Sequence, residues 1–255
     1  MRIGVPREIK DREFRVGLTP SSVAELVRAG HEVVVERGAG AGAGLTDESY
    51  RTSGAVLRQT ADEVFGEAEL VVKVKEPQAA EIARLRRGQA LFTYLHLAAD
   101  RTLTDALMAS GATCIAYETV TAPGGGLPLL APMSEVAGRL APQVGAHYLQ
   151  KSQGGRGVLL GGVPGVPPAD VVILGAGVVG SNAAAIAIGM GASVTVADRN
   201  PDALRRLEFA LRGRARTIFS TYTAIAELIK RADLVVGAVL TPGAAAPKIV
   251  SRAML

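Results

Sequence analysis

The sequence has few of the residues that build metal sites, disulfides or membrane spans. Its 255 residues include one cysteine, three histidines and no tryptophan. One cysteine excludes an internal disulfide, and with three scattered histidines it matches no zinc spacing, so we expect no metal. No apolar run reaches about 18 residues, which argues against a transmembrane helix. The charged N-terminus lacks the apolar core of a secretory signal, and Cys114 is interpreted as a core residue in a reducing compartment, so we predict a cytoplasmic protein.

The basic residues do not indicate a nucleic-acid surface. The net charge is +4, with arginines clustered at residues 84–87 and 205–216. These arginines are interleaved with acids and leucines, and aromatic residues make up only 4% of the chain. We interpret the clusters as solvated helix faces and expect neither nucleic acid nor a membrane as partner. The sequence also contains no GxSxG motif and no Walker lysine.

The most informative segment is residues 169–198, ADVVILGAGVVGSNAAAIAIGMGASVTVAD. It is typical of a strand, a glycine turn, a helix and a second strand that ends in an acid. Gly175 permits the tight turn, Gly177 lets the backbone approach a pyrophosphate, and Gly180 lets the helix pack closely on the strands. The helix N-terminus attracts the phosphates. Asp198, 18 residues beyond Gly180, can accept hydrogen bonds from a ribose diol.

The acid also indicates which dinucleotide is bound. The carboxylate of Asp198 repels a 2′-phosphate, which favours NAD over NADP, although the adjacent Arg199 weakens this preference. Val239 and Leu240 end an expected strand at residues 234–240, where an adenine or ribose lies in this fold.

Strands alternate with helices along the whole chain, which predicts an α/β protein with parallel sheets. We expect two doubly wound domains. Residues 1–130 are predicted to form a flavodoxin-like substrate domain, and residues 131–255 a linking helix at 134–151 followed by an NAD-binding Rossmann domain. A Rossmann domain normally has two more strands after this point, so we interpret the second domain as incomplete at its C-terminus, with a further helix starting at residue 248.

Three ionisable residues of the first domain fall where ligands bind in such sheets, beyond the carboxyl ends of strands. Arg15 follows the first strand, Lys75 ends a strand expected at 70–75, and His96 nearly ends one expected at 90–97. Arg15 can bind a carboxylate through two hydrogen bonds, Lys75 can hold a carboxylate or polarise a carbonyl, and His96 can exchange a proton. His96 stands out because a polar side chain in this apolar strand is unlikely to be buried without a function.

Some alternatives to these residues stay open. Lys73 shares the expected strand face with Lys75, and either lysine could be the functional one. His31 follows a helix end and is interpreted as solvated, whereas His147 is interpreted as a surface or packing residue of the linking helix.

These residues lie within longer motifs that resemble one family. GVPREIKDREFRVGLTP, VVKVKEP, LFTYLHLA, LAPMSEVAGRLA, GGRGVLLGGVPGV and VVILGAGVVG are all similar to motifs of the alanine dehydrogenase and pyridine nucleotide transhydrogenase family. The resemblance covers the whole chain. The transhydrogenase subunit shares the fold but lacks a working amino-acid site, so Arg15, Lys75 and His96 together favour the dehydrogenase.

The resemblance implies that L-alanine, NAD and water are converted reversibly to pyruvate, ammonium and NADH. It implies that Arg15 and Lys75 hold the substrate carboxylate and carbonyl oxygen, that His96 is the general acid and base, and that Tyr94 and Met133 line the pocket. The implied NAD contacts are Ser134, Val178, Val179, Asp198, Ser220, Val239 and Leu240. The resemblance also implies a homohexamer for the full-length protein.

Two departures from the family pattern leave alternatives. Ala203 stands where the family usually has a lysine or arginine, so one adenosine or phosphate contact is either lost or supplied by Arg199. The family's second catalytic residue, an aspartate, lies beyond Leu255. A non-catalytic NAD-binding fragment and a transhydrogenase-like hydride carrier, which would need a membrane partner, are therefore kept as alternatives.

Overall fold

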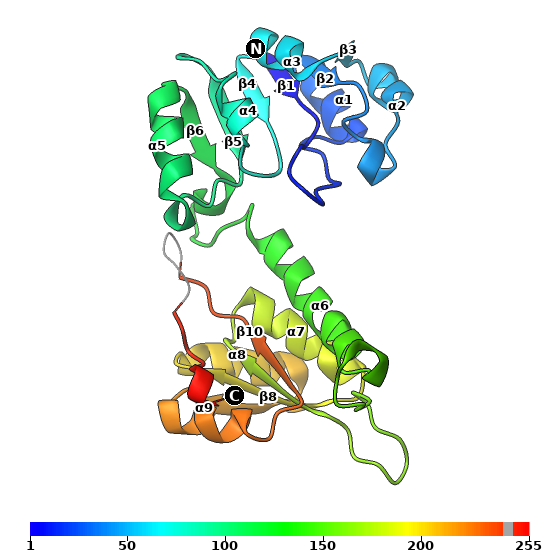
Figure 1. The fold of residues 1–255 in the computed structure, drawn as a ribbon, viewed down its shortest axis with the longest axis vertical. Helices are drawn as coiled ribbons and strands as arrows, with labels where there is room; N and C mark the ends of the chain where they lie inside the picture. Colours follow the sequence, from blue (N-terminus) through cyan, green and yellow to red (C-terminus); the bar gives the residue numbers. More distant parts are fainter. Residues whose placement is uncertain (242–246, 255) are drawn as a thin grey trace. The chain divides into compact units, whose positions relative to one another are not determined.

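The computed structural model describes residues 1–241 and 247–254. The chain divides into two compact units, Met1–Leu127 and Pro128–Leu255, and each unit has its own sheet and helices (Figure 1). The boundary predicted from the sequence lies after residue 130, three residues beyond this division. In the described part of the chain, no helix is long and apolar enough to cross a membrane.

The first unit is built on a six-stranded parallel sheet in the order β3-β2-β1-β4-β5-β6. Its strands are β1 (Arg2–Val5), β2 (Glu32–Glu36), β3 (Val56–Arg58), β4 (Leu70–Val72), β5 (Ala90–Thr93) and β6 (Thr113–Ala116). Without the short edge strand β3, which the sequence did not reveal, the order is the expected flavodoxin-like one. The strand order reverses between β1 and β4, where doubly wound sheets bind ligands.

Five α-helices accompany the described strands of the first unit. They are α1 (Pro20–Arg28), α2 (Asp47–Thr52), α3 (Ala61–Glu67), α4 (Ala79–Ile82) and α5 (Arg101–Ser110). The side chains of Thr19, Thr46, Thr60 and Asp100 each accept a hydrogen bond from a backbone N–H of the first turn, which explains where α1, α2, α3 and α5 begin. The core centres on the fully buried valines of β2 at residues 33–35.

The second unit holds a four-stranded parallel sheet in the order β10-β7-β8-β9. Its strands are β7 (Asp170–Leu174), β8 (Ser193–Asp198), β9 (Arg216–Phe219) and β10 (Leu234–Gly237). Its α-helices are α6 (Ala131–Tyr148), α7 (Val178–Gly189), α8 (Pro201–Leu211) and α9 (Tyr222–Ile229). This strand order is that of the first four strands of a Rossmann sheet, with the reversal between β7 and β10.

The long helix α6 packs directly on α7 (Figure 1). A Cβ at Gly138 would lie 2.3 Å from the carbonyl oxygen of Val179, so only glycine permits this approach. A Cβ at Gly145 would lie 2.4 Å from the side chain of Leu234, which brings α6 equally close to β10. α6 is therefore an integral part of the second unit.

Several strands end earlier than the sequence predicts. β4 ends at Val72 rather than residue 75, β5 at Thr93 rather than residue 97, and β10 at Gly237 rather than residue 240. The physical reason is visible after β5, where backbone N–H groups turn to a side chain instead of a neighbouring strand. Leu95 and His96 both donate to the carboxylate of Glu118. Apolar composition alone does not reveal where ladder hydrogen bonds stop.

Two other segments form little helix. The helix α4 is only four residues long. The helix expected from residue 248 is wrong for the described residues, which form only a 3-10 turn at Arg252–Met254. Leu255, the last residue of that expected helix, lies outside the described residues.

Candidate functional site

The glycine turn of the second unit has the geometry that dinucleotide binding needs. Gly175 has φ +113°, and a Cβ there would lie 2.6 Å from the carbonyl oxygen of Ala238. A Cβ at Gly180 would lie 1.8 Å from the carbonyl oxygen of Gly175, so α7 packs against the turn too closely for any side chain. A Cβ at Gly177 would meet no described atom within 4 Å, so this backbone faces open space at the N-terminus of α7. An anion can approach that helix end directly.

Asp198 ends β8 beside this turn and is fixed by two backbone hydrogen bonds. Its Oδ2 accepts from the N–H of Ala176 at 2.6 Å, and its Oδ1 accepts from the N–H of Asn200 at 2.8 Å. Each carboxylate oxygen keeps a second lone pair that can accept from a ribose hydroxyl. The carboxylate is therefore both tied to the glycine turn and able to bind a diol.

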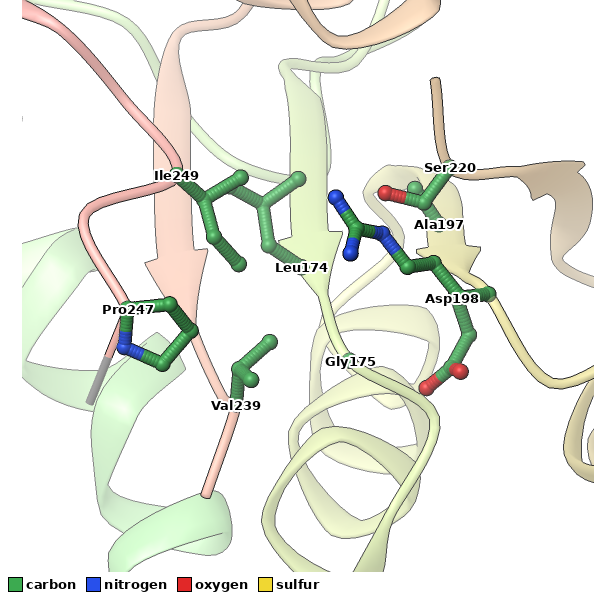
Figure 2. Close-up of a pocket in the computed structure, with 9 residues that line it drawn as sticks. Leu174, Gly175, Ala197, Asp198, Ser220, Val239, Pro247 and Ile249 are labelled. Atoms are coloured by element: carbon green, nitrogen blue, oxygen red, sulfur yellow. The ribbon is translucent and has the colours of Figure 1, made fainter. Parts of the chain in front are cut away.

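A cavity of about 160 Å³ opens at the carboxyl ends of β7, β8 and β10. Figure 2 shows Gly175 between Val239 on one side and Asp198 on the other. The cavity is lined by Leu174, Gly175, Ala197, Asp198, Arg199, Ser220, Val239, Pro247 and Ile249. Ser220 and Val239 line it as the sequence led us to expect, whereas the predicted contact Leu240 is 59% exposed and is not among the lining residues.

The remaining predicted nucleotide contacts lie around the start of α7. Val178 and Val179 form its first turn, and Val178 is exposed. Ser134 and Met133 lie in the first turn of α6. Ser134 is one helical turn before Gly138, on the side of α6 that packs on Val179. Ala203, the departure from the family pattern, lies in the first turn of α8, whereas Arg199 lines the cavity itself.

In the first unit, Arg15 is held by a neighbouring carboxylate that the sequence analysis did not single out. Its Nε donates to Glu13 Oε1 at 2.8 Å, and its second terminal nitrogen donates to Oε2 at 2.6 Å. The bond from Arg15 lowers the pKa of Glu13, and the charge of Lys75 lowers it further. Glu13 therefore binds Arg15 and lies within electrostatic reach of Lys75.

The structure distinguishes the two candidate lysines. Lys73 is 1% exposed and forms ion pairs with Glu8 at 3.0 Å and Glu81 at 2.7 Å. Lys75 is half-buried, and no described carboxylate lies within ion-pair distance of its Nζ. The expectation that both share a strand face is wrong because β4 ends at Val72 and the chain bends at residues 74–75. Lys73 is a buried structural cation, and Lys75 is the lysine open to a ligand.

His96 lies in a strained turn after β5. Its φ of +53° and ψ of +34° are left-handed, which is uncommon for a residue other than glycine and costs roughly 1–3 kcal/mol. The carboxylate of Glu118 holds this turn by accepting from the N–H of His96 at 2.6 Å and from that of Leu95 at 3.1 Å. His96 is exposed and lies three residues beyond the end of β5, so the expectation that it nearly ends a strand is wrong. Its imidazole is instead presented to solvent.

Tyr94 lies beside His96 and within electrostatic reach of Arg15. Its ring stacks on that of His96 with centroids 6.2 Å apart and meets Tyr117 edge-on at 4.9 Å. Burial raises the pKa of Tyr94, while the charge of Arg15 opposes this shift. Arg15, Lys75, Tyr94 and His96 thus all follow the carboxyl ends of the adjacent strands β1, β4 and β5 in the first unit, whereas Met133 belongs to the second unit.

The first-unit site can bind a small carboxylate and exchange a proton beside it. Arg15 has a planar fork of donors, Lys75 has a single ammonium group, and the exposed imidazole can give or take a proton. Sequence reasoning missed the carboxylates of Glu8, Glu13 and Glu118. The first two lie in a charged loop that offered no periodic pattern. Among the residues that the structure describes, no cluster of three or more His, Cys, Asp or Glu side chains could hold a metal ion.

Comparison with known proteins shows the family of the chain. The family model "Alanine dehydrogenase/PNT, N-terminal domain" matches residues 4–137, and the corresponding C-terminal domain model matches residues 141–255. The chain is 61% identical over its whole length to an alanine dehydrogenase of Mycobacterium tuberculosis (strain CDC 1551 / Oshkosh) and covers 69% of that protein. It is 53% identical to a solved L-alanine dehydrogenase, with a TM-score of 0.92, covering all of this chain and 70% of the other.

A transhydrogenase is a more distant neighbour. The solved structure of the transhydrogenase from Sinorhizobium meliloti has a TM-score of 0.82 and 28% identity, and the match covers all of this chain and 74% of that one. The expected resemblance is therefore confirmed, together with the α/β fold of two doubly wound units. The chain belongs to the alanine dehydrogenase/PNT family.

Proposed function

We propose that this protein is an NAD-dependent alanine dehydrogenase, which converts L-alanine and water reversibly to pyruvate and ammonium. The observation that carries the proposal is the 61% identity to an alanine dehydrogenase over all 255 residues. The side chains support it, because Arg15, Lys75 and His96 follow the carboxyl ends of the adjacent strands β1, β4 and β5. A transhydrogenase-like hydride carrier, as an alternative, has the lower identity of 28%.

The second unit fits NAD as the cofactor. When bound, NAD supplies the acceptor for the hydride that leaves the amino acid. Gly177 and the first turn of α7 would hold the pyrophosphate, since no described side chain or backbone atom fills that space. Asp198 would accept from the ribose hydroxyls, and Ser220 and Val239 would line the adenosine side of the same cavity. The fixed negative charge of Asp198 disfavours a 2′-phosphate at that position.

The first unit would bind the small substrate. Arg15 would donate two parallel hydrogen bonds to the substrate carboxylate, which requires its guanidinium to exchange part of its contact with Glu13. Lys75 would donate to the carbonyl oxygen of pyruvate and so favour attack at that carbon. His96 would give a proton to this oxygen in one direction and remove it in the other, because an imidazole can both donate and accept a proton.

The test is formation of NADH from L-alanine and NAD by the purified protein, followed by absorbance. We expect turnover with L-alanine and none with D-alanine, and a much lower rate with NADP. An Arg15→Lys variant keeps the positive charge but loses the fork, so its KM for alanine should rise while its affinity for NADH is unchanged. Turnover with neither enantiomer would contradict the proposal.

We also infer from the family resemblance that the protein acts in the cytoplasm and that its full-length form is a homohexamer. Light scattering after size-exclusion chromatography tests the hexamer, since a monomer at micromolar concentration would contradict it.

A further inference from the structure

A cluster of three charged side chains is buried in the first unit, away from solvent. The side chains of Lys73, Glu8 and Glu81 are 0%, 2% and 3% exposed. The Nζ of Lys73 lies 3.0 Å from Glu8 Oε2 and 2.7 Å from Glu81 Oε1. Two carboxylates thus share one ammonium group. Burying such charges is expensive, and replacing them with apolar residues often stabilises a protein, so the cluster calls for an explanation beyond stability.

The two carboxylates form ion pairs with the same ammonium group but bind different parts of the backbone. Glu8 accepts from Lys73 with one oxygen and from the backbone N–H of Val74 with the other, at 2.6 Å. Glu81 faces Lys73 with one oxygen and accepts from the backbone N–H of Gln78 with the other, at 2.8 Å. Glu8 therefore fastens the loop after β1 to residues 73–74, whereas Glu81 fastens the start of α4.

The segment fastened by Glu8 leads directly to Lys75. On the side away from Glu8, this segment is hydrogen-bonded to β5 and to the residue that follows β5. The N–H of Lys73 donates to Phe92 at 3.1 Å, and the hydroxyl of Thr93 donates to the carbonyl of Lys75 at 2.9 Å. Glu8 closes the opposite side, and its own loop runs on to Arg15. The bond from Glu13 is the main cause that raises the pKa of Arg15, and the charge of Glu8 adds to it, which places Glu8 within electrostatic reach of Arg15.

We propose that Glu8 is a positioning residue that sets the spacing between Arg15 and Lys75 by joining the two loops that carry them. The inference rests on the proposed function, because these two cations are taken to hold the substrate. Glu8 does not touch substrate. It acts through Lys73 and the backbone of Val74, and Glu81 anchors α4 without this effect.

The structure provides a matched pair of variants. Glu8→Gln and Glu81→Gln make the same chemical change in the same cluster. Each carboxylate faces two donors, an ammonium group and a backbone N–H. A carboxamide has only one acceptor oxygen, so it can satisfy only one of those donors and turns its NH₂ group toward the other. Both variants should therefore lose stability to a similar extent.

Their catalytic effects should differ. Glu8→Gln should raise the KM for pyruvate by about tenfold or more, because small misplacements of substrate-holding groups are costly, while the Kd for NADH is unchanged. Glu81→Gln should leave the KM for pyruvate near the wild-type value despite its lower melting temperature. Equal KM values in the two variants, raised or not, would overturn the proposal and leave the cluster with a purely structural role.

Amide hydrogen exchange measured by NMR is a second readout that does not depend on turnover. Glu8→Gln should accelerate exchange at Val74, whose N–H donates to Glu8, whereas Glu81→Gln should accelerate it at Gln78, whose N–H donates to Glu81. If wild-type protein turns over no pyruvate, the proposed function fails, and exchange still decides whether Glu8 fixes the segment. Unchanged exchange at Val74 in Glu8→Gln would overturn the positioning role.

Discussion

Two variants of the glycine turn, Gly177→Ala and Gly180→Ala, each add one methyl group. Together they test separately how the turn contributes to nucleotide binding and to folding. The two glycines are three residues apart in one motif, but the structure gives them different surroundings. A methyl group at position 177 meets no described atom within 4 Å, and the backbone there is extended at φ −77° and ψ −162°, which alanine adopts freely. A methyl group at position 180 lies 1.8 Å from the carbonyl oxygen of Gly175.

These distances give opposite expectations for stability. Gly177→Ala should leave the free energy of unfolding unchanged or raise it by about 0.4–1 kcal/mol, because alanine restricts the unfolded chain. Gly180→Ala should lower it by about 3 kcal/mol or more, since helix α7 must move by more than an ångström from a backbone atom that cannot swing aside. The better helix propensity of alanine returns only about 1 kcal/mol.

Gly177→Ala should weaken nucleotide binding although it does not lower stability. In folded Gly177→Ala, the methyl group occupies the space where the pyrophosphate must approach, so the Kd for NADH should rise at least about tenfold, equivalent to about 1.4 kcal/mol. Urea denaturation measures the free energy of unfolding, and fluorescence titration with NADH measures the Kd. Wild-type NADH affinity in Gly177→Ala, or equal losses of stability in both variants, would refute this account of the turn.

Three further perturbations test other parts of the structure. The hydroxyl of Tyr50 donates to the carbonyl of Leu18 at 2.7 Å inside the core, and burial raises the pKa of Tyr50 to about 12. Tyr50→Phe should therefore cost about 1–3 kcal/mol of unfolding free energy in urea, and a cost near zero would contradict the role of this bond. Asp198→Ala removes the charge that disfavours a 2′-phosphate, so the ratio of NADP to NAD activity should rise at least about tenfold; an unchanged ratio would place the discrimination elsewhere. Arg15 holds the pKa of Glu13 below its usual range, so the pair stabilises the fold above the ordinary glutamate pKa, about 4.3, and this contribution is lost as the pH falls through the lowered pKa. Acid titration of thermal stability should accordingly be steeper below this pH for the wild type than for Glu13→Gln, and identical curves would contradict the pairing.

The sequence predicted the second unit better than the first. In the second unit, the strand, the spaced glycines and Asp198 follow one another within a short stretch of chain. The turn, the start of α7 and the position of the cavity could therefore be predicted from the local pattern alone. The same holds for α1, whose start follows from Thr19 and Pro20. Helix caps and tight turns are local, and local chemistry can be read from local sequence.

The site of the first unit depends on contacts between distant residues, which no local pattern carries. The strand ends at Val72 and Thr93 are set by where neighbouring segments stop pairing. The choice between Lys73 and Lys75 is decided by Glu8, which is 65 residues from Lys73. Likewise, the left-handed turn at His96 is held by Glu118, 22 residues further along. Residue types at strand ends suggested this region as the candidate site, but only tertiary structure shows which cation is buried.

The proposed function requires that this protein exchanges a hydride between alanine and NAD and that His96 moves the proton. The most direct measurement is the loss of NADH absorbance when the purified protein is mixed with pyruvate and ammonium, beside a His96→Ala variant. We predict consumption of NADH by the wild type that falls at least about a hundredfold in His96→Ala, with NADH binding by fluorescence unchanged in both. Bound NADH without turnover in the wild type would contradict the claim and show that the chain only binds the nucleotide.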